Sequence, residues 1–357
     1  MVWVDGDIRS ARIHEYNQPL EFDKCSKPVI RHDEEVLIKV GAAGLCHSDL
    51  HLINGEWKNI IPLNLPKTPG HEISGWIEDV GKSVPEYIMK PGDLVAVFGG
   101  WGCGWCIYCK SGDEQLCAFG KWPGLSSFDG GFSEYVLVPT YRFLVNVRGS
   151  GAKPENLAPL TDAGLTPYRA IKKVKSMLGP GKNIGILGIG GLGSYAVQYA
   201  KILGGGSKVF AMDRSDDKLE LASKCGADHL VNLRSTDNLV DRIKAETGNK
   251  MLDVIIDCVG TDKTFYDSIS ILAKGGSVVI VGLFGTTAKI PIAMTVLNEY
   301  KIFGSLWGNY NELRQVIELF NEDRLMNNIT KFRLDDVNEA IKLLKEGQII
   351  GRGVLIP

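Results

Sequence analysis

The sequence predicts an α/β protein of two domains, one built on a doubly wound parallel sheet and the other mostly of β-strands. Its 357 residues exceed the roughly 250 to 300 residues at which a single hydrophobic core stops growing. Residues 8–147 carry short alternating apolar runs, whereas after residue 183 apolar runs alternate with helical patterns. We place the first domain at residues 1–163, completed by residues 307–357, and the second at residues 164–306.

Composition favours a globular protein that binds small molecules. Apolar residues make up 44% of the chain and charged residues 23%, and the formal net charge of -2 lacks the basic excess that a nucleic-acid or anionic-membrane partner requires. No run approaches the ~18 apolar residues of a membrane span, and Met1–Ile13 lacks the apolar core of a signal peptide. We expect a cytoplasmic protein with small-molecule partners. We also expect a homo-oligomer, either a dimer or a tetramer.

The first domain is predicted to be barrel-like, with long loops. Residues 35–40, 78–80, 93–98 and 132–138 predict strands, and Gly or Pro interrupts the pattern about every ten residues. The residues that carry chemistry fall between these runs and are therefore expected on loops. After Pro154 the pattern becomes helical, at residues 155–160 and 168–174.

The second domain alternates strands and helices. Strands are predicted at residues 184–187, 208–212, 254–257 and 277–281, and helices at residues 192–203 and 216–225. Such alternation gives a parallel sheet covered on both faces. A helix at residues 337–347 and a strand at residues 353–356 follow, and we expect this last strand to return to the first domain.

A glycine-rich turn follows the first strand of this doubly wound (Rossmann) domain. Gly188-x-Gly190-x-x-Gly193 ends the strand and opens the helix, so the backbone from Gly188 through Gly191 and Leu192 can approach a pyrophosphate at the helix N-terminus. The motif alone is weak, because a generic turn can also be rich in glycine.

A carboxylate strengthens the dinucleotide interpretation. Asp213 ends the next strand, twenty residues after Gly193, where it can hold the adenosine ribose hydroxyls and repel a 2′-phosphate. We therefore expect NAD rather than NADP. Arg214 follows directly and leaves NADP open, because a guanidinium can accept that phosphate.

Four cysteines form the most specific pattern. Cys103, Cys106, Cys109 and Cys117 lie within fifteen residues, and four thiolates at such spacings can surround one tetrahedral zinc ion and leave no position for substrate. We therefore expect a structural zinc site. An iron–sulfur cluster is the alternative, although the Cys-Pro ending of a ferredoxin segment is absent.

A second metal site is predicted around the stretch Gly44–His51. This stretch reads Gly-Leu-Cys-His-Ser-Asp-Leu-His and combines a thiol, a hydroxyl, a carboxylate and two imidazoles. Cys46 and His71 can provide two ligands of an open, catalytic zinc site, which ordinarily has three protein ligands and one position for water or substrate. The third ligand is not evident from spacing alone.

The chain resembles the zinc-containing medium-chain alcohol dehydrogenases. The resemblance rests on motifs that occur in this order: Cys46 within Gly44–His51, Gly70-His-Glu-x-x-Gly75 with Gly81 and Val84, the four cysteines, the glycine-rich turn, and Gly351–Val354. It implies a GroES-like catalytic domain, a Rossmann domain, and hydride transfer between an alcohol and NAD.

The resemblance also implies a ligand set. The catalytic zinc is expected on Cys46, His71 and a third residue, commonly a cysteine, in the segment from Leu160 to Pro167, where this chain has Asp162. An aspartate keeps the formal charge of the ligand set and coordinates zinc at a normal distance. Glu72 is the competing ligand. Because adjacent residues on a strand point to opposite faces, we expect Glu72 beside the ligands rather than on the metal.

Proton transfer and cofactor contacts follow from the same resemblance. It implies a proton relay from Ser48 through the nicotinamide ribose to His51. The expected cofactor contacts are His47 on a phosphate, Asp213, Arg214 and Lys218 at the ribose, Arg352 on the pyrophosphate, and Leu306 near the end of the second domain.

Other residues leave alternatives open. Cys25, Cys225 and Cys258 lack ligand spacing and are expected to pack in cores. Trp57 and Trp122 can either wall an alcohol pocket or stabilise the fold.

A polyol or sugar dehydrogenase is the rival function, since a carboxylate ligand is less unusual in that class. A zinc-free quinone reductase or a non-catalytic NAD-binding protein would not need both the metal ligands and the relay.

Overall fold

A computed structural model describes residues 6–357, in which the chain divides into two compact units. Unit 1 comprises Met1–Asp162 and Gly308–Pro357, and unit 2 comprises Ala163–Trp307. The domain boundaries expected from the sequence lie one residue away, after residue 163 and after residue 306. The absence of a signal peptide was inferred from Met1–Ile13, of which residues 1–5 lie outside the described residues. Over residues 6–357, no helix has the length and apolarity needed to cross a membrane.

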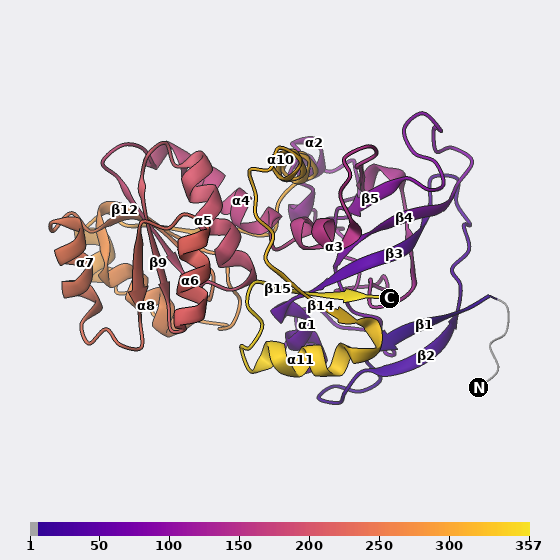
Figure 1. The fold of residues 1–357 in the computed structure, drawn as a ribbon, viewed down its shortest axis with the longest axis horizontal. Coiled ribbons are helices and arrows are strands. Elements are labelled where there is room, and N and C mark those ends of the chain that lie inside the picture. Colours follow the sequence, from indigo (N-terminus) through magenta and orange to yellow (C-terminus); the bar gives the residue numbers. More distant parts are fainter. Residues whose placement is uncertain (1–5) are drawn as a thin grey trace. The chain divides into compact units, whose positions relative to one another are not determined.

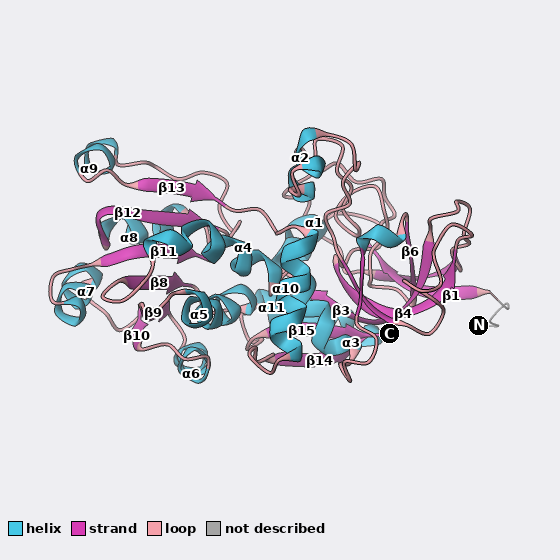
Figure 2. Ribbon diagram, turned by 90° about the horizontal axis from the view of Figure 1, so that it is seen from above, coloured by secondary structure: helices cyan, strands magenta, loops and turns pink. Residues whose placement is uncertain are grey.

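Unit 2 is built on a six-stranded parallel sheet, with strands in the order β10-β9-β8-β11-β12-β13 (Figure 2). Numbered within the unit, this is the order 3-2-1-4-5-6 of a dinucleotide-binding sheet. The strands are β8 (Asn183–Leu187), β9 (Lys208–Asp213), β10 (His229–Asn232), β11 (Leu252–Asp257), β12 (Leu272–Ile280) and β13 (Lys301–Gly304). The predicted doubly wound parallel fold is therefore confirmed.

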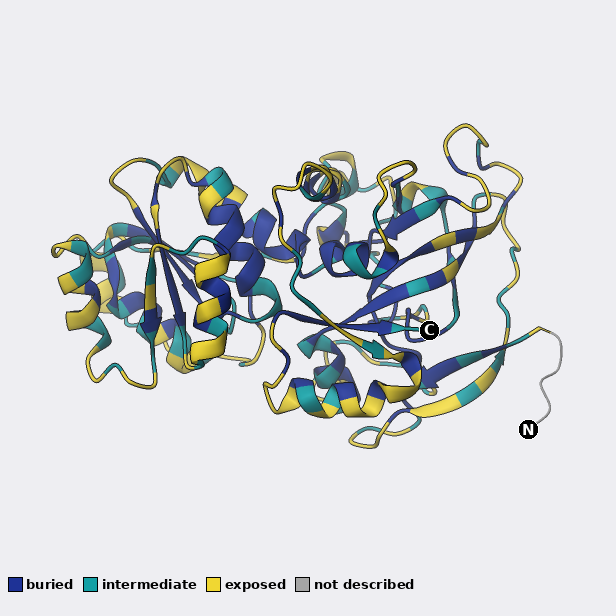
Figure 3. Ribbon diagram, viewed as in Figure 1, coloured by how far each residue is buried: buried dark blue, intermediate teal, exposed yellow. Residues whose placement is uncertain are grey.

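Helices cover both faces of this sheet. They are α4 (Leu165–Val174), α5 (Gly191–Leu203), α6 (Asp216–Lys224), α7 (Leu239–Thr247), α8 (Asp262–Ser270) and α9 (Ile292–Leu297). Every residue of β8 is buried, because helices pack on either side of it. Helix α5 is itself mostly buried, whereas the outward surface of α6 is exposed (Figure 3). The core joins side chains from strands and helices, among them Leu187, Phe210, Ile255 and Phe265.

Unit 1 is mostly β-structure, as the sequence predicts. A seven-stranded sheet has the order β14-β15-β3-β4-β5-β7, with β6 paired to β3, and β1 and β2 form a separate antiparallel pair (Figure 1). The strands are β1 (Asp7–Arg12), β2 (Glu21–Ser26), β3 (Val36–Leu45), β4 (Glu72–Val80), β5 (Leu94–Val97), β6 (Tyr135–Val138), β7 (Leu144–Asn146), β14 (Ile329–Arg333) and β15 (Arg352–Ile356). The expected return of the last strand is correct, since β15 pairs antiparallel with β3.

Five helices accompany these strands. They are α1 (His47–Ile53), α2 (Ile107–Lys110), α3 (Pro154–Leu157), α10 (Tyr310–Asn321) and α11 (Val337–Lys345). The sequence placed the chemistry of this domain on loops, and for Ser48 and His51 that was wrong, because both lie on α1. A seven-residue helix spans about two turns, too short to produce a helical pattern of apolar residues.

The register of unit 1 brings three distant segments to one place. Gly44 near the end of β3 pairs with Glu72 at the start of β4, and Leu45 pairs with Gly353 near the start of β15. Cys46 and His71 are each one residue outside these strands. Two metal-ligand candidates and Arg352 therefore meet at one edge of the sheet.

Candidate active site

Asp49 joins the two segments that carry Cys46 and His71. Its carboxylate is fully buried and accepts hydrogen bonds from the backbone N–H of Cys46 at 2.9 Å and of Gly70 at 3.2 Å. It also lies 3.5 Å from Nδ1 of His71. A carboxylate on the far ring nitrogen fixes the orientation of a metal-binding imidazole, so Nε2 of His71 faces the site. Residue spacing does not reveal this role of Asp49, because its partners at Gly70 and His71 are more than twenty residues away.

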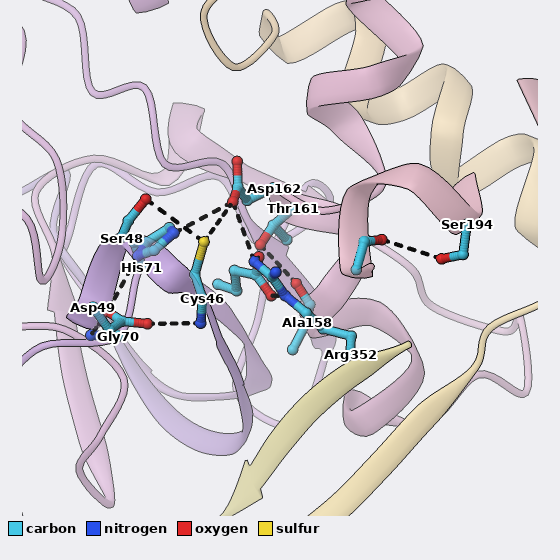
Figure 4. A network of polar contacts seen from close by, with 12 residues as sticks. Cys46, Ser48, Asp49, Gly70, His71, Ala158, Thr161, Asp162, Ser194 and Arg352 are labelled. Carbon is cyan, nitrogen blue, oxygen red and sulfur yellow. Dashed lines mark hydrogen bonds and ion pairs between the residues drawn. The ribbon is translucent and has the colours of Figure 1, made fainter. Parts of the chain in front are cut away.

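Asp162 completes a group of candidate metal ligands with Cys46 and His71 (Figure 4). It follows the 3₁₀ turn Ala158–Thr161, which packs against β3, β4 and β15. Oδ2 of Asp162 lies 3.7 Å from Sγ of Cys46 and 3.3 Å from Nε2 of His71. Tetrahedral zinc with ordinary bond lengths requires sulfur–oxygen and nitrogen–oxygen separations of about 3.6 and 3.4 Å. The three side chains therefore fit one zinc ion.

Glu72 is also within this group, but both of its oxygens face a guanidinium. Nε of Arg352 donates to Oε2 of Glu72 at 3.0 Å, and Nη2 of Arg352 is close to Oε1. The same Nη2 lies 3.4 Å from Oδ2 of Asp162. Gly44 provides the room, since a Cβ there would lie 1.7 Å from Oε2 of Glu72. This arrangement favours Asp162 over Glu72 as the third ligand.

Burial and neighbouring charges shift the pKa values of Glu72 and His71 in this group of candidate ligands. Burial raises the pKa of Glu72 to about 7, and the Arg352 guanidinium opposes that rise. For His71, burial lowers the pKa, but the Asp49 and Asp162 carboxylates outweigh it and hold the pKa well above its ordinary value. The same two carboxylates favour a positive charge on the imidazole, which can be a proton or a bound metal cation. A divalent cation would balance the excess of anionic donor groups at this site.

Arg352 is placed differently from the expected cofactor contact. Its side chain is only 4% exposed, and its guanidinium is engaged with Glu72 and Asp162. Its pKa is held well above the ordinary value by Cys46 and Glu72, although burial acts the other way. The pyrophosphate contact stays a prediction, and the described contact of Arg352 is with the metal-ligand group.

The expected relay residues lie on α1. The Ser48 hydroxyl is 3.6 Å from Sγ of Cys46. His51, one turn further along, is buried, and its ring stacks on Trp57 with centroids 4.8 Å apart. His47 is half-buried on the same helix. Trp57 therefore lies beside the expected relay base.

Trp122, the second tryptophan considered for the pocket, has a different local environment. It lies in a turn in which its backbone N–H donates to the Ser126 hydroxyl at 2.8 Å. Among the other unassigned residues, Cys225 is buried, and Cys25 and Cys258 are half-buried. Burial raises the pKa of the Cys225 thiol to about 11, so this thiol is neutral and packs as an apolar group.

The four clustered cysteines form a second metal-binding geometry. Sγ of Cys106 lies 3.6 Å from that of Cys109 and 3.7 Å from that of Cys117, and the Sγ atoms of Cys103 and Cys109 are 4.0 Å apart. A zinc ion with four sulfurs at its usual bond length requires edges of about 3.8 Å. The backbone N–H groups of Cys103 and Cys106 point at sulfurs of the set, at 3.3 and 3.4 Å. Such N–H donors stabilise a thiolate, whereas a neutral thiol does not require them.

Proton affinities differ within this set. Burial raises the pKa of Cys109 to about 12. For Cys103, burial also acts upward, but the backbone N–H groups of Trp105 and Cys106 lower the pKa to about 7. Four adjacent sulfurs cannot all ionise without a cation to balance them, which is what a structural zinc supplies.

In unit 2 the glycine-rich turn has the geometry that a pyrophosphate requires. Gly188 adopts a φ of +88°, which favours glycine, and its N–H donates to the Met212 carbonyl at 2.9 Å. A Cβ at Gly193 would lie 1.9 Å from the Gly188 carbonyl oxygen, so only glycine allows this close approach. A Cβ at Gly190 would meet nothing within 4 Å. The turn is thus closed on the protein side and open beside Gly190 at the start of α5.

Asp213 holds this turn in shape. One of its carboxylate oxygens accepts from the Ile189 N–H at 2.7 Å, and the other accepts from the N–H groups of Arg214 at 2.7 Å and Ser215 at 3.0 Å. Arg214, the residue after Asp213, is exposed, and Lys218, five residues after Asp213, is half-buried. Leu306, the remaining expected cofactor contact, is exposed to 41%.

Comparison with known proteins places these sites in a family. Residues 32–149 match the alcohol dehydrogenase GroES-like domain, and residues 191–322 match the zinc-binding dehydrogenase family. An NAD-dependent alcohol dehydrogenase of Sulfurisphaera tokodaii is 39% identical over 357 residues, which cover 98% of this chain and 100% of the relative. A D-arabinose 1-dehydrogenase (NADP(+)) of Saccharolobus solfataricus is 32% identical, over 98% of this chain and 97% of that protein.

A solved structure agrees with these relatives. The alcohol dehydrogenase of the hyperthermophilic archaeon Aeropyrum pernix has a TM-score of 0.92 and 35% identity, and the match covers 98% of this chain and 100% of that one. The fold and the two metal-ligand groups define the class of zinc-containing dehydrogenases. The chain belongs to the zinc-containing medium-chain alcohol dehydrogenase family.

Proposed function

We propose that the protein is a zinc- and NAD-dependent alcohol dehydrogenase that interconverts an alcohol and its aldehyde or ketone. The observation that carries this proposal is the set of distances joining Oδ2 of Asp162 to Sγ of Cys46 and Nε2 of His71, 3.7 and 3.3 Å, which fit an open three-ligand zinc site. Three protein ligands leave the fourth position to the substrate oxygen, as an oxidoreductase of this kind requires.

Each residue then has a role. Cys46, His71 and Asp162 hold the zinc, and Asp49 fixes the orientation of His71. A zinc ion held there would supply the Lewis acid for the alcohol oxygen, and bound NAD would supply the hydride acceptor. The Ser48 hydroxyl, 3.6 Å from Sγ of Cys46, would take up the alcohol proton, and His51, one turn further along α1, would be the base that receives it. Glu72 and Arg352 form a buried ion pair beside the ligands, which balances charge without occupying the metal.

The second metal site is proposed to be structural. Cys103, Cys106, Cys109 and Cys117 would hold a zinc ion closed to substrate, so that the protein carries two zinc ions per chain. Because thiolates bind zinc only while reduced, a reducing compartment such as the cytoplasm suits this site.

NAD is proposed as the cofactor because Asp213 would face a 2′-phosphate with like charge. In the variant Asp213→Gly, Arg214 would stand beside a gap, and we expect weaker use of NAD together with measurable use of NADP. A kinetic comparison of both cofactors in the parent and the variant tests this. A parent protein that prefers NADP would contradict the assignment of Asp213.

The test of the function is a spectrophotometric assay of NADH formation with primary, secondary, cyclic and polyol substrates. We expect turnover with at least one alcohol, loss of turnover after treatment with a zinc chelator, and recovery on addition of zinc. Ser48→Ala is the matched variant, since it leaves the three proposed metal ligands in place and removes the hydroxyl of the relay. A zinc-loaded protein that binds NAD and turns over none of these substrates would favour a non-catalytic NAD-binding role.

A polyol or sugar dehydrogenase is the second candidate. Two observations favour it: the third proposed ligand is a carboxylate, and a relative that is 32% identical is a D-arabinose 1-dehydrogenase. A Trp57 ring on the wall of the substrate pocket would favour apolar alcohols instead, because its large apolar face is best buried against apolar groups. The polyol arm of the assay separates the two candidates.

A homo-oligomer is proposed from the surface of unit 2. Strand β13 ends the six-stranded sheet, and exposed apolar side chains surround it, with Ile292 exposed to 72%, Val296 to 67% and Leu297 to 80%. An unpaired strand edge beside such a surface is ordinarily covered. We therefore expect a second copy of the chain to pack there. Leu297→Glu should shift the species seen by size-exclusion chromatography with light scattering toward the monomer, whereas Lys250→Glu, on another part of unit 2, should not.

A further inference from the structure

The turn that follows α1 directs a carboxylate back onto His51. Gly55 adopts a φ of +67°, and a Cβ there would lie 2.8 Å from the ring of Tyr16, so this position requires glycine. The N–H of Glu56 donates to the His51 carbonyl at 3.0 Å. The chain therefore reverses within two residues of the helix end. Glu56 is thereby placed over the last turn of α1.

The Glu56 side chain contacts the imidazole. Its Oε2 forms a close hydrogen bond with Nδ1 of His51, and its Oε1 accepts from Nδ2 of Asn54 at 2.9 Å. The Trp57 ring stacks on the imidazole, with an angle of 20° between the two rings. His51 is 8% exposed, whereas the Glu56 side chain is 50% exposed. The imidazole is thus buried and fixed in position by the carboxylate and the indole, while the carboxylate reaches water.

Glu56 is ionised at neutral pH. The Asn54 amide, and after it His51, lower the pKa of Glu56 below its ordinary value. A carboxylate accepts hydrogen bonds and does not donate them, so its partner Nδ1 must carry a proton. In a neutral imidazole with Nδ1 protonated, Nε2 holds the lone pair and is the basic atom.

We propose that Glu56 is a positioning residue for proton release, which holds His51 in the Nδ1–H tautomer and stabilises its protonated form. The proposal rests on the proposed relay role of His51. The alcohol proton arrives at Nε2 and forms an imidazolium, whose positive charge the ionised Glu56 carboxylate balances through its hydrogen bond with Nδ1. Release of the Nε2 proton to water then restores the neutral Nδ1–H tautomer, so one proton enters and one leaves at Nε2.

Glu56 is a charged group that contacts the His51 ring. Helix α11 also packs on α1, and its charged side chains Glu339, Lys342 and Lys345 are exposed. On α1 itself, Asp49 is committed to the N–H groups of Cys46 and Gly70. An effect of Glu56 on His51 is therefore distinguishable from that of other charges by substitution at position 56.

The test compares zinc-loaded Glu56→Gln with the parent and with the control Glu86→Gln, which removes an exposed carboxylate from unit 1 away from His51. Nitrogen-15 NMR of the ring nitrogens identifies the tautomer of His51, and His51→Gln identifies its signal. We expect the Nδ1–H tautomer in the parent and in Glu86→Gln. We expect mixed tautomers in Glu56→Gln, because an amide can either donate to Nδ1 or accept from it.

Kinetics provide the second readout. We expect kcat of alcohol oxidation in Glu56→Gln to fall about 10-fold near neutral pH, with KM for the alcohol changed by less than about twofold, because the lost interaction forms as the proton leaves. The acidic limb of its pH–rate profile should move to lower pH by about 0.5 to 1 unit. A merely structural role for Glu56 would leave that limb unmoved.

Different results would contradict the role of Glu56 and the relay role of His51. An Nε2–H tautomer in the parent, or a parental tautomer and parental kcat in Glu56→Gln, would overturn the role of Glu56 whatever the enzyme's substrate. A normal rate in His51→Gln, by contrast, would remove His51 from the proton path and with it the proposed relay.

Discussion

Asp49 is the residue whose substitution most directly probes how the active site is held together. Its two carboxylate oxygens have different partners: Oδ2 accepts from the Cys46 N–H at 2.9 Å and Oδ1 from the Gly70 N–H at 3.2 Å. An asparagine has a single acceptor oxygen. In Asp49→Asn one of these backbone donors therefore faces an NH₂ group and loses its acceptor inside a fully buried site.

The expected loss follows from these contacts. A hydrogen bond to a charged group contributes about 1.5 to 3 kcal/mol, and a buried donor left without an acceptor costs about 1 to 3 kcal/mol. We expect the free energy of unfolding of Asp49→Asn to fall by about 2 to 4 kcal/mol, since the two effects overlap. Because His71 also loses its orienting carboxylate, zinc binding at the catalytic site should weaken about 10- to 100-fold.

Urea unfolding of the zinc-loaded protein measures the first quantity, and competition with a colorimetric chelator measures the second. Asp336→Asn is the control, because it makes the same chemical change at an exposed aspartate of unit 1. A change in unfolding free energy below about 0.5 kcal/mol, together with parental zinc affinity, would refute the role assigned to Asp49.

Two further predictions concern stability. Cys106→Ser should release one zinc ion per chain and lower the melting temperature while the folded fraction still turns over, since a closed zinc site contributes its binding energy to folding; a mutant as stable as the parent but inactive would contradict a structural role. For Asp93, burial raises the pKa, but Arg148 and the Lys90 N–H together lower it below its ordinary value. The ionised Asp93 therefore stabilises the folded protein above pH ~4, and this stabilisation is lost as pH falls through the folded-state pKa. Asp93→Asn should therefore reduce the free energy of unfolding by about 1 kcal/mol at pH 7 and by progressively less below pH ~4, as pH-dependent denaturation would measure.

Local patterns predicted what is local in the sequence. The four cysteines lie within fifteen residues, so their spacing alone indicated one metal site, and their sulfurs do converge. The glycine-rich turn, the strand before it and the helix after it were predictable for the same reason, because Gly188, Gly190 and Gly193 lie within six residues of one another. The parallel sheet followed from the alternation of apolar runs and helices.

Long-range pairings could not be predicted from residue patterns. Arg352 pairs with Glu72 across 280 positions, a contact created by the register of β15, β3 and β4. Asp49 meets Gly70 through the same sheet edge. His51 and Glu56 are only five residues apart, but their contact depends on the turn at Gly55, which composition does not reveal. Such contacts decide how the site works, and they are set by the fold.

The zinc content of Asp162→Ala decides whether Asp162 is the third ligand of the catalytic zinc. Metal analysis of the purified parent should give two zinc ions per chain, and Asp162→Ala should approach one, with the cysteine site filled and turnover lost. Glu72→Gln, which changes the competing carboxylate and leaves Asp162 in place, should retain both ions. Two ions and normal turnover in Asp162→Ala, or loss of the catalytic ion in Glu72→Gln alone, would transfer the third ligand position to Glu72.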